Sequence, residues 1–475
     1  MLTRLEVDGF KNLFDLKIDF GPYTCIAGPN AVGKSNVFDV IEFLSLIAEH
    51  PFLEAAQRLR SAGQRPGDPG TLFWVDGQQT REPMKLAVEM IVAEDVTDDF
   101  GQTAKASSTF LRYEVTLAYV PTEYKGTRRM GTIKLVHEDL TYISQTDASA
   151  RLAWTSPYPK FRHQLVKNKR RGQGYISTLN TGADVAFQVH QDGGGRGQPR
   201  RSSVAPRTVL STINTVDDPT IMAARREMQK WRKLALEPTA MRATDDLNDS
   251  SAIGSDGSHL PASLFRQAEP FGEDEVDVYG RVASTASALT DVREVRVDFD
   301  PARETLTLEA RLGRGPFLPA RVLSDGTLRF LALSIIQEDP EFGGLICMEE
   351  PENGIHPAKI SAMVDLLQDL SVDPSEPVSG DNPVRQVIVN THSPRFVAMH
   401  MTHSEDLLLA LPRSIVKNER EITTLTLLPM AKTWRTSSHG YAGSVALIGD
   451  YLTQPSDADA FNQIEYPERE VDELD

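Results

Sequence analysis

Hydrophobic and polar positions alternate at the start of the chain and then take up a helical spacing. Apolar residues at positions 2, 5 and 7, and again at 16, 18 and 20, are separated by polar ones, which predicts two half-buried strands. Tyr23–Ala27 is an apolar run of strand length, and apolar residues from 37 to 47 recur every three or four positions. The first fifty residues therefore predict strands that are followed by a helix.

The rest of the chain continues this mixture of strand and helix patterns. The predicted strands cover 84–92, 111–120, 345–348 and 387–389. The predicted helices cover 221–234, 327–337 and 360–370, the last one starting after Pro357. Gly, Pro and polar residues indicate loops over 61–82 and 244–258. The order of these elements is typical of an α/β fold.

The composition narrows the class of protein. The chain has 475 residues, 40% of them hydrophobic, which suits about three domain-sized units or one large domain with an insertion. Its net charge of −17 excludes a general nucleic-acid coat. No apolar run approaches the ~20 residues that cross a bilayer, no signal-peptide pattern is found, and Cys25 and Cys347 are expected to be reduced core thiols. We therefore expect a cytoplasmic protein without a membrane partner.

Residues 151–208 differ in charge from the rest of the chain. They hold eleven Lys or Arg and only two acidic residues, a local charge of +9. Three interpretations stay open: a solvated loop, an insertion that contacts nucleic-acid phosphates, or a surface for an acidic partner such as the acidic tail of a second copy. The residues considered for such an anion contact are Lys167, Lys169, Arg170 and Arg171, together with Arg200 and Arg201.

One segment carries a phosphate-binding pattern. Gly28, four further residues and then Gly33-Lys34-Ser35 stand between a predicted strand and a predicted helix, which is the context that a P-loop requires. Glycines let backbone N–H groups converge on phosphate oxygens, and the positive end of the following helix points to the same place. Lys34 would reach the β- and γ-phosphates, and Ser35 would bind Mg²⁺. The sequence therefore predicts a site for Mg-ATP.

Three further segments could complete such a site. Glu349 and Glu350 follow a predicted buried strand, where one acid can hold the metal and its neighbour can polarise water. Ser324 and Gly326 stand at the start of a predicted helix, a position that can bind an anion or can simply cap the helix. His392 follows another buried strand, where it could sense a γ-phosphate or serve a structural role.

Taken in this order, the four segments resemble the heads of ABC-type ATPases, most closely the SMC/RecF-like branch and the compact ATPases of the OLD family. The resemblance rests on residues 1–50 and 320–396. It implies an α/β P-loop ABC-ATPase head with a mixed central sheet, helices, an antiparallel β-subdomain and a large, partly basic insertion. The parts it suggests are 1–150 and 261–400 for the head, 151–260 for the insertion or lid, and 401–475 for C-terminal strands and an acidic tail.

The resemblance implies a role for each matched residue, with ATP and Mg²⁺ as cofactors. Glu350 takes the position of the general base, Lys34 that of the phosphate-binding lysine and His392 that of the switch. Ser35 and Glu349 take the metal positions. The nucleotide-binding residues that it implies are Asn30, Ala31, Val32, Gly33, Lys34, Ser35 and Asn36.

The resemblance also implies that ATP lies between two copies of the chain, in a dimer or a higher assembly. Ser324, Asp325 and Gly326 are then the signature that caps the γ-phosphate bound to the other copy. This signature departs from that of transporters at Asp325 and Thr327, and the metal-side acid is Glu349 where Asp is usual. These departures bear on the rate of hydrolysis. Gln78 and Gln79 are the candidates for the Q-loop glutamine, and the alternative is that they belong to an ordinary loop.

Many compact relatives of the OLD family look like subunits of bacterial anti-phage or toxin–antitoxin-like systems. We therefore expect a sensor or regulatory ATPase that controls a separately encoded effector, a nuclease or a toxin. A DNA-repair or chromosome-type ATPase and an assembly scaffold with little turnover are the alternatives. OLD nucleases carry a Toprim domain after the head, whereas here 81 residues follow Pro394 and Asp457-Ala-Asp459 lies in an acidic stretch, so no nuclease is expected in this chain.

Overall fold

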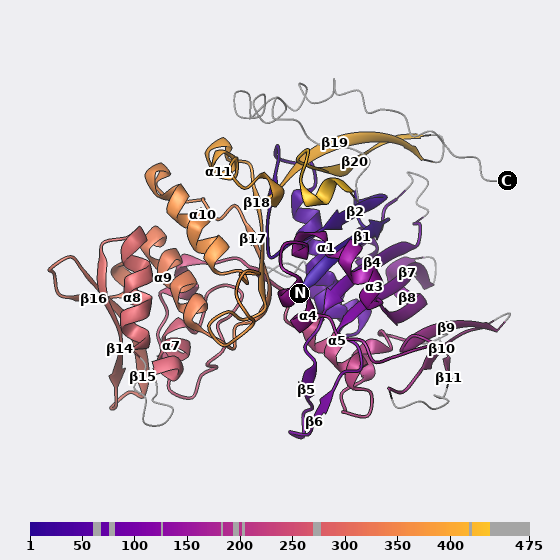
Figure 1. The fold of residues 1–475 in the computed structure, drawn as a ribbon, viewed down its shortest axis with the longest axis horizontal. Helices are drawn as coiled ribbons and strands as arrows, with labels where there is room; N and C mark the ends of the chain where they lie inside the picture. The colour runs from indigo at the N-terminus through magenta and orange to yellow at the C-terminus, as the bar shows by residue number, and fades with distance from the viewer. Residues whose placement is uncertain are drawn as a thin grey trace.

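In the computed structural model, two lobes lie on either side of a central parallel sheet (Figure 1). The structure describes residues 1–59, 68–75, 81–124, 127–181, 184–192, 199–201, 205–268, 277–417 and 420–437. Gln78, Gln79, Asp457 and Asp459 therefore lie outside the described residues, as does the acidic stretch around the last two.

The central sheet has the strand order β12-β17-β18-β3-β19-β20 and is parallel except for its last pair. The inner strands β3, β17 and β18 are buried along almost their whole length and are mostly apolar, because both faces of the sheet are covered. Ile26 and Cys347 face one core, whereas Cys25 and Ile346 face the other. The strands are β3 (Tyr23–Ala27), β12 (Arg232–Leu234), β17 (Gly344–Glu349), β18 (Arg385–Thr391), β19 (Leu407–Lys417) and β20 (Arg420–Pro429).

An antiparallel sheet of eight strands forms the body of the first lobe, in the order β11-β10-β9-β8-β7-β4-β1-β2. A separate hairpin, β5 (Asp95–Thr97) and β6 (Thr103–Lys105), projects from this lobe (Figure 1). The strands of the large sheet are β1 (Leu2–Asp8), β2 (Leu16–Asp19), β4 (Met84–Ile91), β7 (Phe110–Tyr124), β8 (Thr127–Tyr142), β9 (Ile176–Thr181), β10 (Asp184–Val189) and β11 (Pro199–Arg201).

Helix α1 (Lys34–Ile47) joins the two sheets. Its buried side chains, including Phe38 and Ile41, share one core with β1, β4 and β7 on one side and with β17 and β18 on the other. The first lobe also contains α2 (Phe52–Arg58), α3 (Gln145–Arg151), α4 (Pro159–Leu165) and α5 (Pro219–Gln229). Because α1 starts where the P-loop ends, the two sheets together fix the orientation of that loop.

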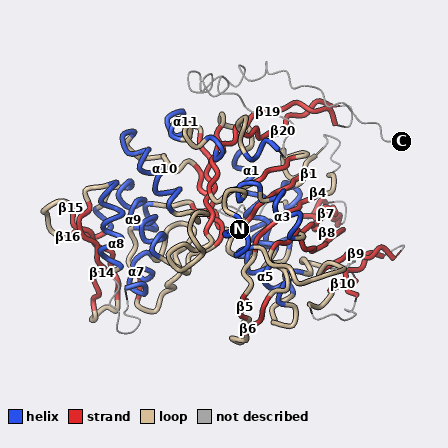
Figure 2. The backbone as a smooth tube through the Cα atoms, in the orientation of Figure 1, coloured by secondary structure: helices blue, strands red, loops and turns tan. Residues whose placement is uncertain are grey.

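The second lobe packs helices on the other face of the central sheet (Figure 2). A small sheet of β13 (Asp245–Asp246), β14 (Val292–Asp300), β15 (Thr305–Leu312) and β16 (Phe317–Pro319) covers its far side. The helices are α6 (Pro238–Met241), α7 (Leu260–Ala268), α8 (Val278–Leu289), α9 (Asp325–Glu338), α10 (Ile360–Asp369) and α11 (Pro394–Met399).

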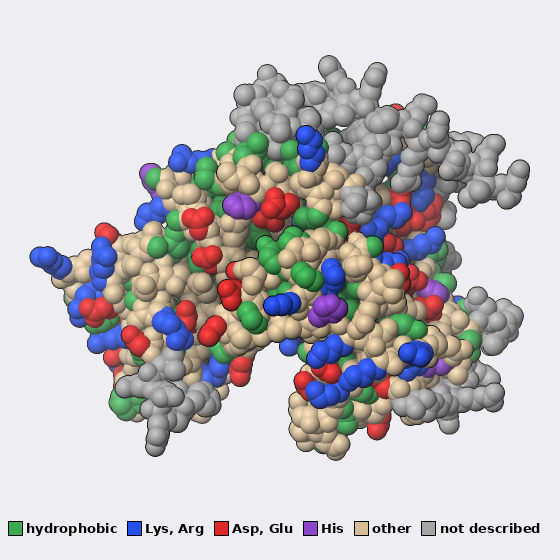
Figure 3. Space-filling model, viewed as in Figure 1, with side chains coloured by type: hydrophobic (Ala, Val, Ile, Leu, Met, Phe, Trp, Pro, Cys, Tyr) green, Lys and Arg blue, Asp and Glu red, His purple; other side chains and the backbone are tan. Residues whose placement is uncertain are grey.

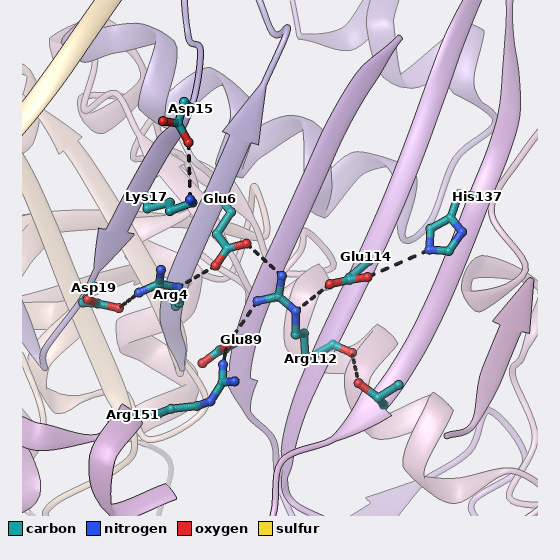
Figure 4. A network of polar contacts seen from close by, with 11 residues as sticks. Arg4, Glu6, Asp15, Lys17, Asp19, Glu89, Arg112, Glu114, His137 and Arg151 are labelled. Atoms are coloured by element: carbon teal, nitrogen blue, oxygen red, sulfur yellow. Dashed lines mark hydrogen bonds and ion pairs between the residues drawn. The ribbon is translucent and has the colours of Figure 1, made fainter. Parts of the chain in front are cut away.

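A network of charges crosses the face of the antiparallel sheet that points away from α1 (Figure 4). Arg112 on β7 lies 2.8 Å from Glu6, 3.1 Å from Glu89 and 2.6 Å from Glu114. Arg151 also pairs with Glu89, which is buried. Although burial raises the pKa of Glu6, hydrogen bonds from Arg112 and Arg4 lower it to about 2. These ion pairs join β1, β4 and β7 across the sheet.

The α/β fold with a mixed central sheet and an antiparallel β-subdomain is confirmed, and one predicted helix is wrong. Residues 221–234 do not form one helix, because α5 ends at Gln229 and Arg232–Leu234 pair with β17 as an edge strand. The range 151–260 contributes β9, β10 and β11 to the antiparallel sheet and β12 to the central sheet.

Both cysteines are buried and free. Among the described residues, no helix is long and apolar enough to cross a bilayer.

Candidate nucleotide-binding site

Three loops meet at the carboxyl edge of the central sheet. Strands β3, β18 and β17 run parallel, and their register sets Ala27 beside Thr391 and Asn390 beside Glu349. The P-loop leaves β3, the two adjacent acids end β17, and His392 follows β18. The topology therefore brings segments that are far apart in the chain to one edge, which is where open α/β sheets bind their ligands.

The two glycines of the P-loop are required for different reasons. Gly33 has a φ of 108°, in the left-handed region, and a Cβ there would lie 2.7 Å from Nδ2 of Asn12. Gly28 lies against β19, where a Cβ would lie 2.3 Å from the carbonyl oxygen of Ala410. Asn12 also accepts a hydrogen bond of 2.7 Å from Asn36. The P-loop is thus held between the turn after β1 and strand β19.

Lys34 is buried at the centre of the P-loop. Its Nζ donates to the carbonyl oxygens of Gly28 and Pro29, at 2.7 and 2.6 Å. Burial lowers its pKa to about 8, against the opposing effect of nearby carboxylates. A cavity of about 240 Å³ opens beside it, lined by Asn30, Ala31, Gly33, Lys34, Ser35, Asn36, Glu350 and Asn390. Six of the seven nucleotide-binding residues expected from the sequence line this cavity, while Val32 packs in the core.

Two oxygen donors stand where the sequence places a metal. Ser35 Oγ donates to Glu349 Oε2 at 3.1 Å. The other oxygen of Glu349 lies 2.8 Å from Lys233 Nζ, and Lys233 lies 3.4 Å from Asp39 on α1. Hydroxyl and carboxylate oxygens are the ligands that Mg²⁺ prefers, so Ser35 and Glu349 fit that ion.

Glu350 is the carboxylate that reaches the cavity. Its φ of 46° lies in the left-handed region, where a residue other than glycine is strained. The backbone N–H of Glu350 donates to the carbonyl oxygen of Asn390 at 2.9 Å, which holds the turn on β18. One carboxylate oxygen lies 2.6 Å from His392 Nδ1, and the other accepts a bond of 2.7 Å from Asn353. The candidate base and the candidate switch residue are therefore in direct contact.

The signature residues lie at the start of α9. Ser324 Oγ accepts a bond of 3.3 Å from the backbone N–H of Thr327, so it caps the helix. Asp325 is exposed and pairs with Arg242 at 2.5 Å. A Cβ at Gly326 would meet no atom closer than 3.6 Å, so nothing within the described chain demands a glycine there. None of the three lines the cavity at the P-loop of the same chain.

Three of the four basic residues from 167 to 171 are paired within the chain. Lys167 and Lys169 both contact Glu94, at the base of the β5–β6 hairpin, and these bonds hold the pKa of Glu94 below its usual range. Arg170 donates to three backbone carbonyls and stacks on Tyr175. Among Lys167, Lys169, Arg170 and Arg171, only Arg171 is exposed without a described contact, and the side chains of Arg200 and Arg201 lie outside the described ones. Figure 3 shows Lys and Arg side chains together with acidic ones low on this face, beside β5 and β6.

Three residues of the site have no role assigned from the sequence. Asn12 lies in a polar turn and touches the P-loop; Lys233 lies on an edge strand beside β17; Asn353 lies in the loop after the two acids. Asn353 has the strongest signal, since it stands three residues after Glu350 in Glu349-Glu-Pro-Glu-Asn353. For Asn12 and Lys233 only the fold supplies the contact.

Comparison with known protein families shows to which family the chain belongs. Residues 133–398, more than half of the chain, match the family model described as "AAA domain, putative AbiEii toxin, Type IV TA system". The chain belongs to this AAA family. The match spans the segment from β8 to α11 and includes the signature, both acids and His392. Together with the P-loop, this match supports an ABC-type P-loop ATPase head.

The chain is also similar to two curated proteins over short stretches. The "DNA replication and repair protein RecF" of Lactococcus lactis subsp. cremoris (strain MG1363) is 39% identical over 64 residues, 13% of this chain and 18% of that protein. RecF of Lactobacillus gasseri is 44% identical over 50 residues, 10% of this chain and 13% of that protein. The match thus spans less than a fifth of either relative.

Among solved structures, an SMC head bound to the C-winged helix domain of ScpA aligns over 91% of this chain and 99% of its own, with 13% identity and a TM-score of 0.46. The SMC head domain from Thermotoga maritima aligns over 90% of this chain and 98% of its own, with 11% identity and a TM-score of 0.36.

Proposed function

We propose that this AAA-family chain binds Mg-ATP between two copies of itself and hydrolyses it in the cytoplasm. The observation that carries the proposal is the meeting of Lys34, Ser35, Glu349 and Glu350 at one edge of the central sheet, beside a cavity that the P-loop lines. A basic group, two oxygen donors for a metal and a carboxylate positioned by a neighbour are the parts that phosphoryl transfer requires.

Each residue has a defined task in this mechanism. Lys34, whose Nζ now contacts two carbonyls of the P-loop, would turn to the β- and γ-phosphates. Ser35 and Glu349 would hold Mg²⁺, which supplies positive charge to the phosphates when it is bound. Glu350 would orient the attacking water and accept its proton, and His392 would place its free ring nitrogen near the γ-phosphate. The signature of the second copy would close the site.

The role of Glu350 is tested by removing its basicity while keeping its shape. In Glu350→Gln we expect hydrolysis to fall by 10²-fold or more, the scale of general-base effects, while ATP binding is kept. Phosphate release and binding of a fluorescent ATP analogue would be measured on the same preparation. Lys34→Ala, which should lose binding, is the matched control. Hydrolysis at the wild-type rate in Glu350→Gln would refute the assignment.

The signature is tested by complementation between two inactive chains. Lys34→Ala lacks a working P-loop and Ser324→Arg lacks a working signature, so each should be inactive alone. A mixed dimer contains one site in which both halves are intact, and the mixture should therefore recover activity. A mixture as inactive as either variant would contradict a nucleotide shared between copies.

We also propose that the ATP cycle controls a separately encoded effector, a nuclease or a toxin, in a bacterial anti-phage defence system. The family description, which names a putative toxin and a type IV toxin–antitoxin system, supports the defence setting of this proposal. The test is to express the chain with the product of its neighbouring gene and to compare phage resistance with that of Glu350→Gln and Lys34→Ala. Resistance that is the same in all three would reject a controlling role for ATP.

A second candidate function is an ATPase that acts on DNA in repair. The short identity to RecF favours it, since both RecF relatives are named as DNA replication and repair proteins. The two functions differ in what stimulates turnover. Duplex DNA that accelerates ATP hydrolysis by the purified chain, in the absence of any partner protein, would support the repair function over the defence function.

A further inference from the structure

Both oxygens of the Glu350 carboxylate are held by neighbours. Oε1 lies 2.6 Å from His392 Nδ1, and Oε2 accepts a hydrogen bond of 2.7 Å from the Asn353 side chain. The backbone N–H of Asn353 also donates to the carbonyl oxygen of Glu350 at 2.9 Å. Residues 350–353 therefore form a turn that is closed twice, once by the backbone and once by the two side chains. The amide of Asn353 fixes which way the carboxylate points.

The same turn is tied to the signature helix. Nη1 of Arg329, on α9, donates to the carbonyl oxygen of Asn353. The start of α9 is capped by Ser324. A chain of contacts thus runs from the signature along α9 to Arg329, to Asn353 and to Glu350. Because an α-helix moves as a rigid body, a shift of its first turn displaces Arg329 as well.

We propose that Asn353 is a positioning residue for Glu350 and that Arg329 makes its position depend on the signature. This inference rests on the proposed function, in which Glu350 orients the attacking water. In a dimer, the signature of one copy contacts the nucleotide bound to the other copy, whereas Glu350 of the first copy acts on its own nucleotide. The Arg329–Asn353 link therefore joins the two nucleotide sites, and occupation of one site helps to set the base at the other.

The positioning role of Asn353 predicts an effect on turnover and not on binding. In Asn353→Ala we expect kcat to fall by about 10- to 100-fold, the scale of a small misplacement of a catalytic group, with KM and binding of a fluorescent ATP analogue unchanged. Asn353→Asp keeps the shape but sets a second carboxylate against Glu350, so its kcat should fall further. Asn382→Ala is the matched control, because Asn382 also bonds through its amide, but to the loop that follows α10.

The link through Arg329 predicts a loss of cooperativity. If the wild type shows a Hill coefficient above 1 for ATP, up to the limit of 2 set by two sites, then Arg329→Met should bring it to about 1. Arg329→Lys, which keeps a donor, should restore part of it. Arg329 acts on Glu350 only through the Asn353 side chain in this scheme, so the double variant Arg329→Met/Asn353→Ala should be no slower than Asn353→Ala.

The outcomes separate this inference from the proposed function. Hydrolysis by the wild type that Asn353→Ala leaves within about two-fold, or that falls only because KM rises, would overturn the positioning role alone. A Hill coefficient that Arg329→Met leaves unchanged, or a wild type that shows no cooperativity, would overturn the link. A wild type that binds ATP but does not hydrolyse it would overturn the proposed function and this inference with it.

Discussion

A buried carboxylate outside the nucleotide site should make stability depend on pH. Glu138 on β8 is fully buried and accepts hydrogen bonds from the backbone N–H groups of Val209 and Leu210, at 2.6 and 2.9 Å, and from the Tyr113 hydroxyl at 3.1 Å. Burial raises its pKa from 4.5 to about 7, the hydrogen bonds oppose this, and the Asp139 carboxylate adds to it. The segment at 209–212 is thereby attached to the antiparallel sheet through an acid that resists ionisation.

The sign and the size follow from these two pKa values. Below pH 4.5 the carboxyl is protonated in both the folded and the unfolded chain, and above pH 7 it is ionised in both. In between, the folded chain binds the extra proton, so the free energy of unfolding falls as the pH rises from about 4.5 to 7. The difference between a pKa of 4.5 in the unfolded chain and about 7 in the folded chain corresponds to about 3 kcal/mol in the free energy of unfolding. Glu138→Gln removes this titration.

The assay compares urea unfolding of the wild type and Glu138→Gln at several pH values from 5 to 8. Groups that titrate alike in both proteins cancel in the difference. We expect the wild type to lose about 2.5 kcal/mol relative to the variant over this range. Glu304→Gln, an exposed position without a described side-chain contact, is the control and should follow the wild type. Curves for the wild type and Glu138→Gln that stay parallel would refute the reasoning.

Four other variants test the fold and the signature. Arg112→Met removes the cation between three carboxylates, one of them the buried Glu89, and should lower the free energy of unfolding by about 3 kcal/mol, as urea titration would show. Gln386→Leu leaves three buried backbone groups without their partner and should cost about 3 kcal/mol by the same measurement. Gly326→Ala should keep the wild-type melting temperature and lose hydrolysis, whereas Gly28→Ala should lower the melting temperature, since only Gly28 has a backbone atom in the way.

The parts of the site that the sequence predicts are those in which one short segment carries both the structure and the chemistry. The strand before Gly28 and the helix after Ser35 are local patterns, and the same holds for the buried strand before Glu349. The parallel order of these strands then brings the motifs together. Local patterning therefore suffices for the P-loop, for the two acids and for the general α/β architecture.

Contacts made by the fold alone could not be predicted in this way. The pairing of Lys233 with Glu349 depends on a three-residue edge strand, and the polar residues at 232 and 233 resemble the continuation of a helix. The basic residues at 167 and 169 suggested an external anion, but their partner Glu94 comes from a hairpin far along the chain. Charge counted along a sequence window omits such partners, because a sheet places distant segments side by side.

The strand order of the central sheet also determines when its strands can pair during translation. Strand β3 leaves the ribosome early, but its neighbours are β18 and β19, which begin at Arg385 and Leu407. At 5–20 residues per second, roughly 20–70 s pass before the first neighbour emerges. The antiparallel strands β1, β2, β4, β7 and β8 pair within the first 142 residues and can fold meanwhile. A nascent chain of this protein can therefore complete the sheet around its phosphate loop only after β18 and β19 have been synthesised.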